Sequence, residues 1–131
     1  MSQYVDGFVL PIAADKVEAY RAMSDKAGAI WKEYGALEYR ECVGEDLHIP
    51  DMLSFKTIAG AGEGETVIFA FITYNSREHR DEVNAKVMAD PRLKDTCGGD
   101  NMPFDFKKMA YGVPVILNTC LLYTSPSPRD S

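Results

Sequence analysis

The sequence predicts an α+β domain of the ferredoxin-like class, with the element order βαββαβ and a four-stranded antiparallel sheet that carries two helices on one face. Two observations lead to this class. Strand-like apolar segments and segments with helical three- and four-residue spacing follow one another in that order. The chain is also the length of one domain, with 131 residues of which 46% are hydrophobic.

The first strand is predicted over residues 4–10, YVDGFVL, and Pro11 is expected to end it. The helix that follows is predicted over 15–34. Asp15 and Glu18 have the spacing of a capping box at its start. Apolar residues then recur every three or four positions, and Gly35 stands where a left-handed C-terminal cap is expected.

The second and third strands are predicted over residues 37–43, LEYRECV, and 66–74, TVIFAFITY. An acidic loop joins them. Within this loop the segment LSFKTI, residues 53–58, has the pattern of a short strand, and the glycines of GAGEG indicate a turn into the third strand.

A second helix is predicted to begin after the cap residues Asn75 and Ser76 and to run to Ala89, before Asp90 and Pro91 stop it. A short helical turn over 91–94 and a loop follow. The final strand is expected near residues 109–117, which completes the order of elements.

The third strand carries a further inference, because VIFAFI is apolar on both of its faces. Two helices shield only one face of a four-stranded sheet, so something else must cover the other face. A second copy of the chain is the simplest cover. We therefore predict a homodimer in which two sheets close a barrel-like core, a dimeric α/β barrel.

Composition excludes several classes of function. The net charge of −6 and the absence of a basic cluster argue against a nucleic-acid partner. No apolar run approaches the roughly 20 residues that span a bilayer, so no membrane segment is expected, and the N-terminus lacks a signal-peptide layout. We therefore expect a cytoplasmic protein. The three cysteines are too few and too irregular for a disulfide framework, and with His48 isolated in its acidic loop we predict no metal and no cofactor.

Four segments, YVDGFVLP, AGAIWKEYGALEYRECVG, SREHRDEVNAKVMADPRL and MPFDFKKMAYG, together resemble the YbaA-like family, domain of unknown function 1428, of the dimeric α/β-barrel superfamily. The resemblance covers residues 3 to about 117 and implies a ferredoxin-like protomer and a dimer, with no established reaction. Such proteins finish near residue 117, and CLLYTSPSPRD is similar to a translated sequencing adapter. We therefore expect one domain over 1–118 and a non-native tail over 119–131.

Polar residues on the second helix and on two strands are the candidate site. His79, Arg80 and Asn84 lie at the margins of the buried stripe of the helix, where they would point into a space between helix and sheet. His79 is the candidate general base, because its ordinary pKa is near neutrality. Alternatively, His79 packs at the margin and satisfies a nearby polar group.

Charged residues on covered strands need partners, so Asp6, Arg40 and Glu41 are candidates for an internal ion pair, within one chain or across the dimer. In the functional interpretation Arg40 is a second catalytic candidate, which binds a carboxylate or an enolate-like oxygen of a small ligand. The candidate ligand-binding residues are Asp6, Arg40, Glu41, His79, Arg80 and Asn84.

Three classes of function fit these residues. The first is a homodimeric module that binds a small molecule in a partly apolar pocket. The second is a cofactor-independent enzyme, resembling the oxygenases and isomerase-like proteins of the same superfamily. The third is a structural or interaction protein that has no ligand.

Overall fold

A computed structural model describes residues 2–97 and 102–118. Its strands are β1 (Tyr4–Ala13), β2 (Glu38–Val43), β3 (Glu65–Tyr74) and β4 (Ala110–Gly112). They form one antiparallel sheet in the order β2-β3-β1-β4. This order, with a helix after β1 and another after β3, confirms the predicted ferredoxin-like fold.

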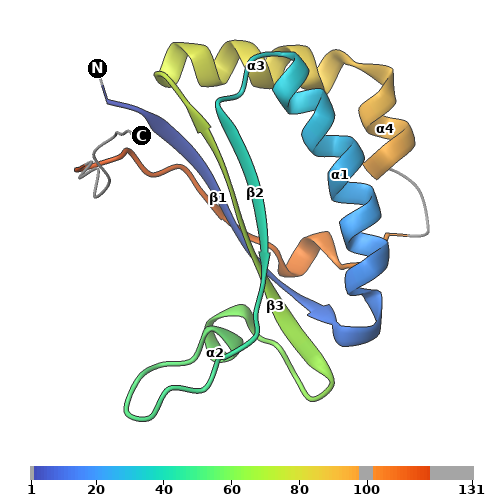
Figure 1. Cartoon of the computed structure of the whole chain (residues 1–131), viewed down its shortest axis with the longest axis vertical. Helices are drawn as coiled ribbons and strands as arrows, with labels where there is room; N and C mark the ends of the chain where they lie inside the picture. The colour runs from blue at the N-terminus through green and yellow to red at the C-terminus, as the bar shows by residue number, and fades with distance from the viewer. Residues whose placement is uncertain (1, 98–101, 119–131) are drawn as a thin grey trace, which may run out of the picture.

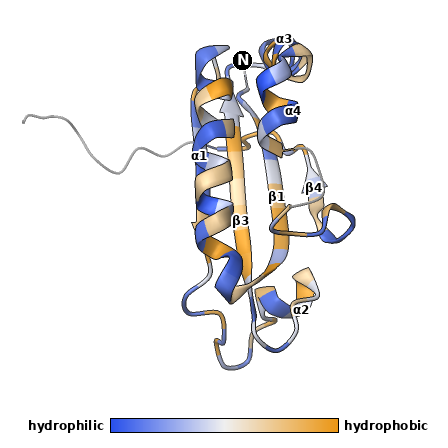
Figure 2. Ribbon diagram, turned by 90° about the vertical axis from the view of Figure 1, so that its right-hand side faces the viewer, coloured by the Kyte–Doolittle hydropathy of each residue, from blue (hydrophilic) through white to orange (hydrophobic). Residues whose placement is uncertain are grey.

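Helices cover one face of the sheet, as Figures 1 and 2 show. They are α1 (Val17–Glu33), α3 (Arg77–Ala89) and α4 (Pro91–Cys97), so the predicted turn after α3 is a complete short helix. The fourth helix, α2 (Phe55–Ala59), lies near the opposite face, where Phe55 meets Phe69 of β3 edge to face. The helices therefore cover the two faces unequally.

The core lies between the sheet and the covering helices, and it divides into two clusters. One is centred on Ile72 and Tyr74 of β3 and on Val83 and Val87 of α3. The other is centred on Leu10, Ile12, Tyr20, Ile68 and Ala70. The even-numbered residues of β1 and β3 therefore point toward the helices, because strand side chains alternate between faces.

The remaining residues point the other way and define a surface that we call the open face. The register of the strands places opposite each other the residues that share a face. The open face comprises Val5, Gly7, Val9, Pro11, Glu38, Arg40, Cys42, Val67, Phe69, Phe71, Thr73, Ala110 and Gly112. Its middle is apolar, and Phe69 is 41% exposed there.

Two local predictions were wrong. No capping box opens the first helix: Ala14–Lys16 forms a 3₁₀ turn, α1 begins at Val17 without a side-chain cap, and Glu18 instead pairs with Arg21. The segment predicted as a short strand is helical. Ser54 caps α2 by accepting from the Lys56 amide, and Gly60 ends it with a positive φ of 72°.

The outer strand segments also differ from the prediction. Pro11 does not end β1, which continues to Ala13. Pro11 is tolerated because β4 pairs only with Gly7–Val9, so β1 has a neighbour on one side alone at this point. The last strand is short, since β4 ends before Val113 and Pro114, but the chain stays beside β1 through a bridge between Tyr4 and Val115.

The predicted tail over 119–131 lies outside the described residues. Among the helices that are described, none is long and apolar enough to cross a membrane.

The cap of α3 provides a test of the fold. The Ser76 hydroxyl accepts a hydrogen bond from the His79 amide at 3.2 Å, as predicted for this boundary. We expect Ser76→Ala to lower the free energy of unfolding by about 1 kcal/mol, because it leaves a helix amide unsatisfied. Urea denaturation would measure this. Ser54→Ala, at the cap of the five-residue α2, is the control and should change global unfolding less; an equal effect would contradict the prediction.

Candidate functional site

A cavity of about 660 Å³ lies between the sheet and the covering helices. Its walls come from β1, β2 and β3, from α1, α3 and α4, and from residues 102–111. Most of these side chains are apolar. They include Phe8, Met23, Trp31, Met88, Leu93 and Phe104. Two carboxylates, Asp6 and Glu41, also line the cavity, and they differ in the number and kind of their hydrogen-bond donors.

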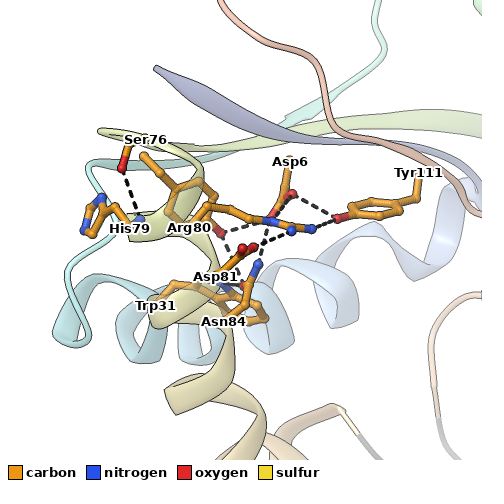
Figure 3. A network of polar contacts seen from close by, with 9 residues as sticks. Asp6, Trp31, Ser76, His79, Arg80, Asp81, Asn84 and Tyr111 are labelled. Atoms are coloured by element: carbon orange, nitrogen blue, oxygen red, sulfur yellow. Dashed lines mark hydrogen bonds and ion pairs between the residues drawn. The ribbon is translucent and has the colours of Figure 1, made fainter. Parts of the chain in front are cut away.

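Asp6 is held by donors from three elements, as Figure 3 shows. Its side chain is 3% exposed. Oδ2 accepts from the Tyr74 hydroxyl at 3.0 Å and from Asn84 Nδ2 at 3.1 Å. Oδ1 accepts from the Tyr111 hydroxyl at 2.9 Å and from Arg80 Nε at 3.2 Å. Four donors match the four acceptor positions of a carboxylate, so Asp6 is saturated.

The partners of Asp6 are themselves fixed. The Asn84 side-chain oxygen accepts from Trp31 Nε1 at 3.0 Å, which joins α3 to α1. Arg80 also donates to the Tyr111 hydroxyl at 2.6 Å and to Asp81 at 2.8 Å. Burial, and then the neighbouring Asp6, raise the pKa of Tyr74, so its hydroxyl remains a donor. The four hydrogen bonds leave Asp6 no acceptor position for a ligand.

Glu41 stands on β2, and its hydrogen-bond partners among the described residues are two tyrosines. Oε1 accepts from the Tyr20 hydroxyl at 2.7 Å, and Oε2 accepts from the Tyr39 hydroxyl at 2.9 Å. Burial in the cavity wall raises the pKa of Glu41, although these two hydrogen bonds oppose the shift. Burial, and then the nearby carboxylate, raise the pKa values of Tyr20 and Tyr39 in turn.

A thiol completes this end of the cavity. Cys97 of α4 is partly buried and lines the same space. Burial, followed by the charge of Glu41, raises the pKa of its thiol, so the protonated form is favoured. This environment does not activate Cys97 as a nucleophile, because nucleophilic attack needs the thiolate.

A glycine in the middle of α1 makes room for Tyr39. A Cβ atom at Gly28 would stand 2.8 Å from Cδ1 of the Tyr39 ring, closer than real contacts allow. Glycine costs a helix roughly 1 kcal/mol relative to alanine. Close approach of the ring is therefore the local reason for glycine here, and it sets the position from which the Tyr39 hydroxyl reaches Glu41.

A second hollow, of about 420 Å³, lies between α1 and β2. Polar and charged residues such as Arg21, Ser24 and Lys32 line it. Tyr20, Tyr39 and Glu41 line both this groove and the larger cavity. The three side chains therefore border both the cavity and this groove.

The structure brings together only some of the predicted site residues. Asp6, Arg80 and Asn84 form one network and Glu41 lines the same cavity. Within one chain Arg40 pairs with neither Asp6 nor Glu41, because it stands on the open face; a pair across a dimer stays a prediction. The Nε of Arg40 bonds Glu38 at 3.1 Å, and both side chains are largely exposed. Arg80 is the cation that pairs with Asp6.

His79 does not enter the cavity that we expected it to serve. Its Nδ1 accepts a hydrogen bond from the Asn75 amide at 2.9 Å, and its ring meets Tyr74 edge to face. Nε2 lies near the end of α1, at 3.5 Å from where a Cβ of Gly35 would stand. The position matches the alternative interpretation, in which the imidazole packs at the helix margin and satisfies a local polar group.

Sequence reasoning missed the tyrosines that hold the two carboxylates. Tyr20 and Tyr39 are 21 and two positions from Glu41, and Tyr111 is 105 positions from Asp6. Strand alternation alone places Tyr39 and Glu41 on one face, and this signal was available. No group of three or more His, Cys, Asp or Glu side chains among the described residues is arranged to hold a metal ion.

Comparison with known proteins gives a family and a fold. A family model described as a protein of unknown function, DUF1428, matches residues 3–106. The uncharacterized protein YbaA of Escherichia coli K12 is 46% identical over 110 residues, which cover 84% of this chain and 92% of YbaA. The sequence of the same name from Shigella flexneri matches equally well.

Solved structures with low identity share the fold. An uncharacterized NIPSNAP domain protein from Burkholderia xenovorans has a TM-score of 0.58 at 15% identity, covering 90% of this chain and 98% of its own. A protein described as dimeric and ferredoxin-like, from an uncultured marine organism, has a TM-score of 0.52 at 8% identity, covering 93% and 100%. At such identities the similarity concerns the fold alone.

The raised pKa of Glu41 predicts a pH dependence of stability. The folded chain holds the Glu41 proton more tightly than the unfolded chain does. The free energy of unfolding therefore falls as pH rises from the ordinary glutamate pKa of 4.5 through the raised pKa of the folded state. Glu41→Gln removes this loss. Over that interval we expect the free energy of unfolding of the variant to increase relative to the wild type, then to level off.

Urea denaturation across a pH series measures the difference. Glu38→Gln changes an exposed glutamate of the same strand and is the control. Wild-type and Glu41→Gln stabilities that stay parallel over the whole series would contradict the assignment.

Proposed function

The chain belongs to the DUF1428 family of proteins of unknown function, and we propose that it is a homodimeric small-molecule-binding protein. The cavity between the sheet and the covering helices carries this proposal, since it is about 660 Å³ in volume and lined by apolar side chains around a few fixed polar groups. Ligand sites in proteins have this size and composition.

The apolar lining of this open cleft supports a ligand. A concave apolar surface that the protein leaves uncovered is typical of a binding site. Two small residues, Ala27 of α1 and Ala70 of β3, line the cavity where larger side chains would fill it. Aromatic rings surround them, so the apolar space is kept open between well-packed clusters.

The open face supports the dimer. Val5, Val9, Phe69 and Phe71 make its middle apolar, and α2 covers part of it through contacts with β1 and β3, among them Phe55 against Phe69. Further exposed apolar side chains adjoin that contact on α2 and the loop before it: Ile49, Met52, Leu53, Phe55 and Ile58. A second copy of the chain would cover both groups at once, and isologous contacts of this kind are common in dimers.

A cofactor-independent enzyme of the oxygenase or isomerase type is the second candidate function. Glu41 favours it, because a carboxylate with a raised pKa beside an apolar cavity has the properties of a general base. Glu41 takes the role that we expected of His79, while Arg40, which also borders the cavity, is paired with Glu38.

Filling the cavity tests the binding function. Ala27→Leu adds a large side chain at a buried cavity position, whereas Ala85→Leu adds the same atoms on the exposed side of α3. We expect Ala27→Leu to weaken binding of the neutral probe 2-methoxynaphthalene at least several-fold, and Ala85→Leu to leave it unchanged, as measured by fluorescence titration. Equal affinities of the two variants, with both folded by circular dichroism, would contradict the cavity as the binding site.

Placing a charge on the open face tests the dimer. Phe69→Glu would bury carboxylates between two apolar sheets, so we expect the variant to be a monomer by native mass spectrometry when the wild type is a dimer. Leu37→Glu is the control, since Leu37 is also 41% exposed but precedes β2 and is not part of the open face. A dimeric Phe69→Glu chain would exclude this interface.

A further inference from the structure

The two carboxylates of the cavity differ in how many hydrogen bonds they still accept. Asp6 receives four donors and is saturated. Glu41 receives two, one on each oxygen. A carboxylate has about four acceptor positions, so each Glu41 oxygen keeps one for another donor.

No cation competes for Glu41 within the part of the chain that the structure describes. None of the ion pairs there includes it. Its two phenol partners stay protonated because burial, and then the carboxylate, raise their pKa values. Glu41 is thus an acceptor held in place by two donors, with its remaining acceptor positions unused by the protein.

The surroundings of Glu41 limit what can approach it from the cavity. Tyr20, which bonds its Oε1, packs edge to face against Phe104, and Tyr39 packs against Trp31 with ring centroids 5.9 Å apart. Aromatic rings therefore pack against both phenols that hold Glu41. Three cations, Arg40, Arg80 and Lys94, line the same cavity against the two carboxylates Asp6 and Glu41, so the lining carries an excess of positive charge that disfavours a cationic ligand.

We propose that Glu41 is the ligand-contacting carboxylate of the cavity and that its ligand is an apolar molecule with a hydroxyl or phenol group, which donates to a Glu41 oxygen. This inference rests on the proposed binding function and names its ligand class. Tyr20 and Tyr39 are positioning residues that aim the carboxylate, and Gly28 makes the space for Tyr39. The hydroxyl replaces the water that an ionised carboxylate loses on burial.

A pair of matched probes tests the inference on the full chain. 2-Naphthol has an apolar ring system and a phenol hydroxyl, whereas 2-methoxynaphthalene has the same rings without the donor. We expect the wild type to bind 2-naphthol roughly tenfold more tightly than 2-methoxynaphthalene, because only 2-naphthol donates a hydrogen bond to the charged carboxylate. Glu41→Gln should reduce this preference several-fold, and Glu38→Gln on the opposite face should leave it unchanged.

Two further measurements separate contact with Glu41 from a general effect on the fold. Excited 2-naphthol is a strong acid: its O–H bond breaks, the electron pair stays on the naphthol oxygen, and an adjacent carboxylate takes the proton. Bound to the wild type it should emit as naphtholate, and bound to Glu41→Gln as the neutral form. Gly28→Ala, which displaces Tyr39 by crowding its ring, should reduce the preference for 2-naphthol while binding of 2-methoxynaphthalene is kept.

The outcomes distinguish this inference from the proposed function. Equal affinity for the two probes in the wild type, with Ala27→Leu weakening both, would overturn the role of Glu41 and leave cavity binding in place. If the preference for 2-naphthol survives Glu41→Gln but is lost in Asp6→Asn, the acceptor is Asp6, and the role of Glu41 is overturned as well. Binding of neither probe would overturn the proposed function and this inference together.

Discussion

The burial of Asp6 is the constraint on which the arrangement of the helices depends. An ionised carboxylate in an apolar interior costs several kcal/mol unless hydrogen bonds replace its water. Here Tyr74 of β3, Tyr111 of β4 and two residues of α3 supply those bonds. Because the bonds meet at one side chain of β1, they fix α3 against the sheet, and the bond from Trp31 to Asn84 extends this constraint to α1.

The residues that fix the helices also line the cavity. The cluster around Ile72, Tyr74 and Val83 is closely packed, and beyond it the small side chains of Ala27 and Ala70 face the cavity. Glu41 lies at that wall, where burial raises its pKa and only phenols satisfy it. Two carboxylates on one face of a sheet thus differ: Asp6 accepts four hydrogen bonds that join three elements, and Glu41 accepts two at the border of the cavity.

The sequence predicted the elements that have strong local signals and missed those that depend on distant partners. The apolar run of β3, the Ser76 cap and the stop at Asp90 and Pro91 define their elements without tertiary context. Helix α2 was missed because five residues contain too little periodicity to outweigh their apolar pattern. Burial of Asp6 and Glu41 was foreseen, but Arg80 and the tyrosines that satisfy them come from other elements, and a helical margin alone did not distinguish His79 from Arg80.

Strand β3 connects the cavity to the open face, because its alternating side chains serve both. Ala70 and Ile72 line the cavity, while Phe69 and Phe71, which alternate with them, belong to the open face, and Phe71 also borders the cavity. A partner that packs on Phe69 and Phe71 would therefore contact the same strand, β3, that supplies Ala70 and Ile72 to the cavity. The neighbouring β2 repeats this relation, since Glu41 faces the cavity between Arg40 and Cys42, which belong to the open face. A partner bound to the open face and a ligand bound beside Glu41 would share two strands, so each would stabilise the backbone on which the other depends.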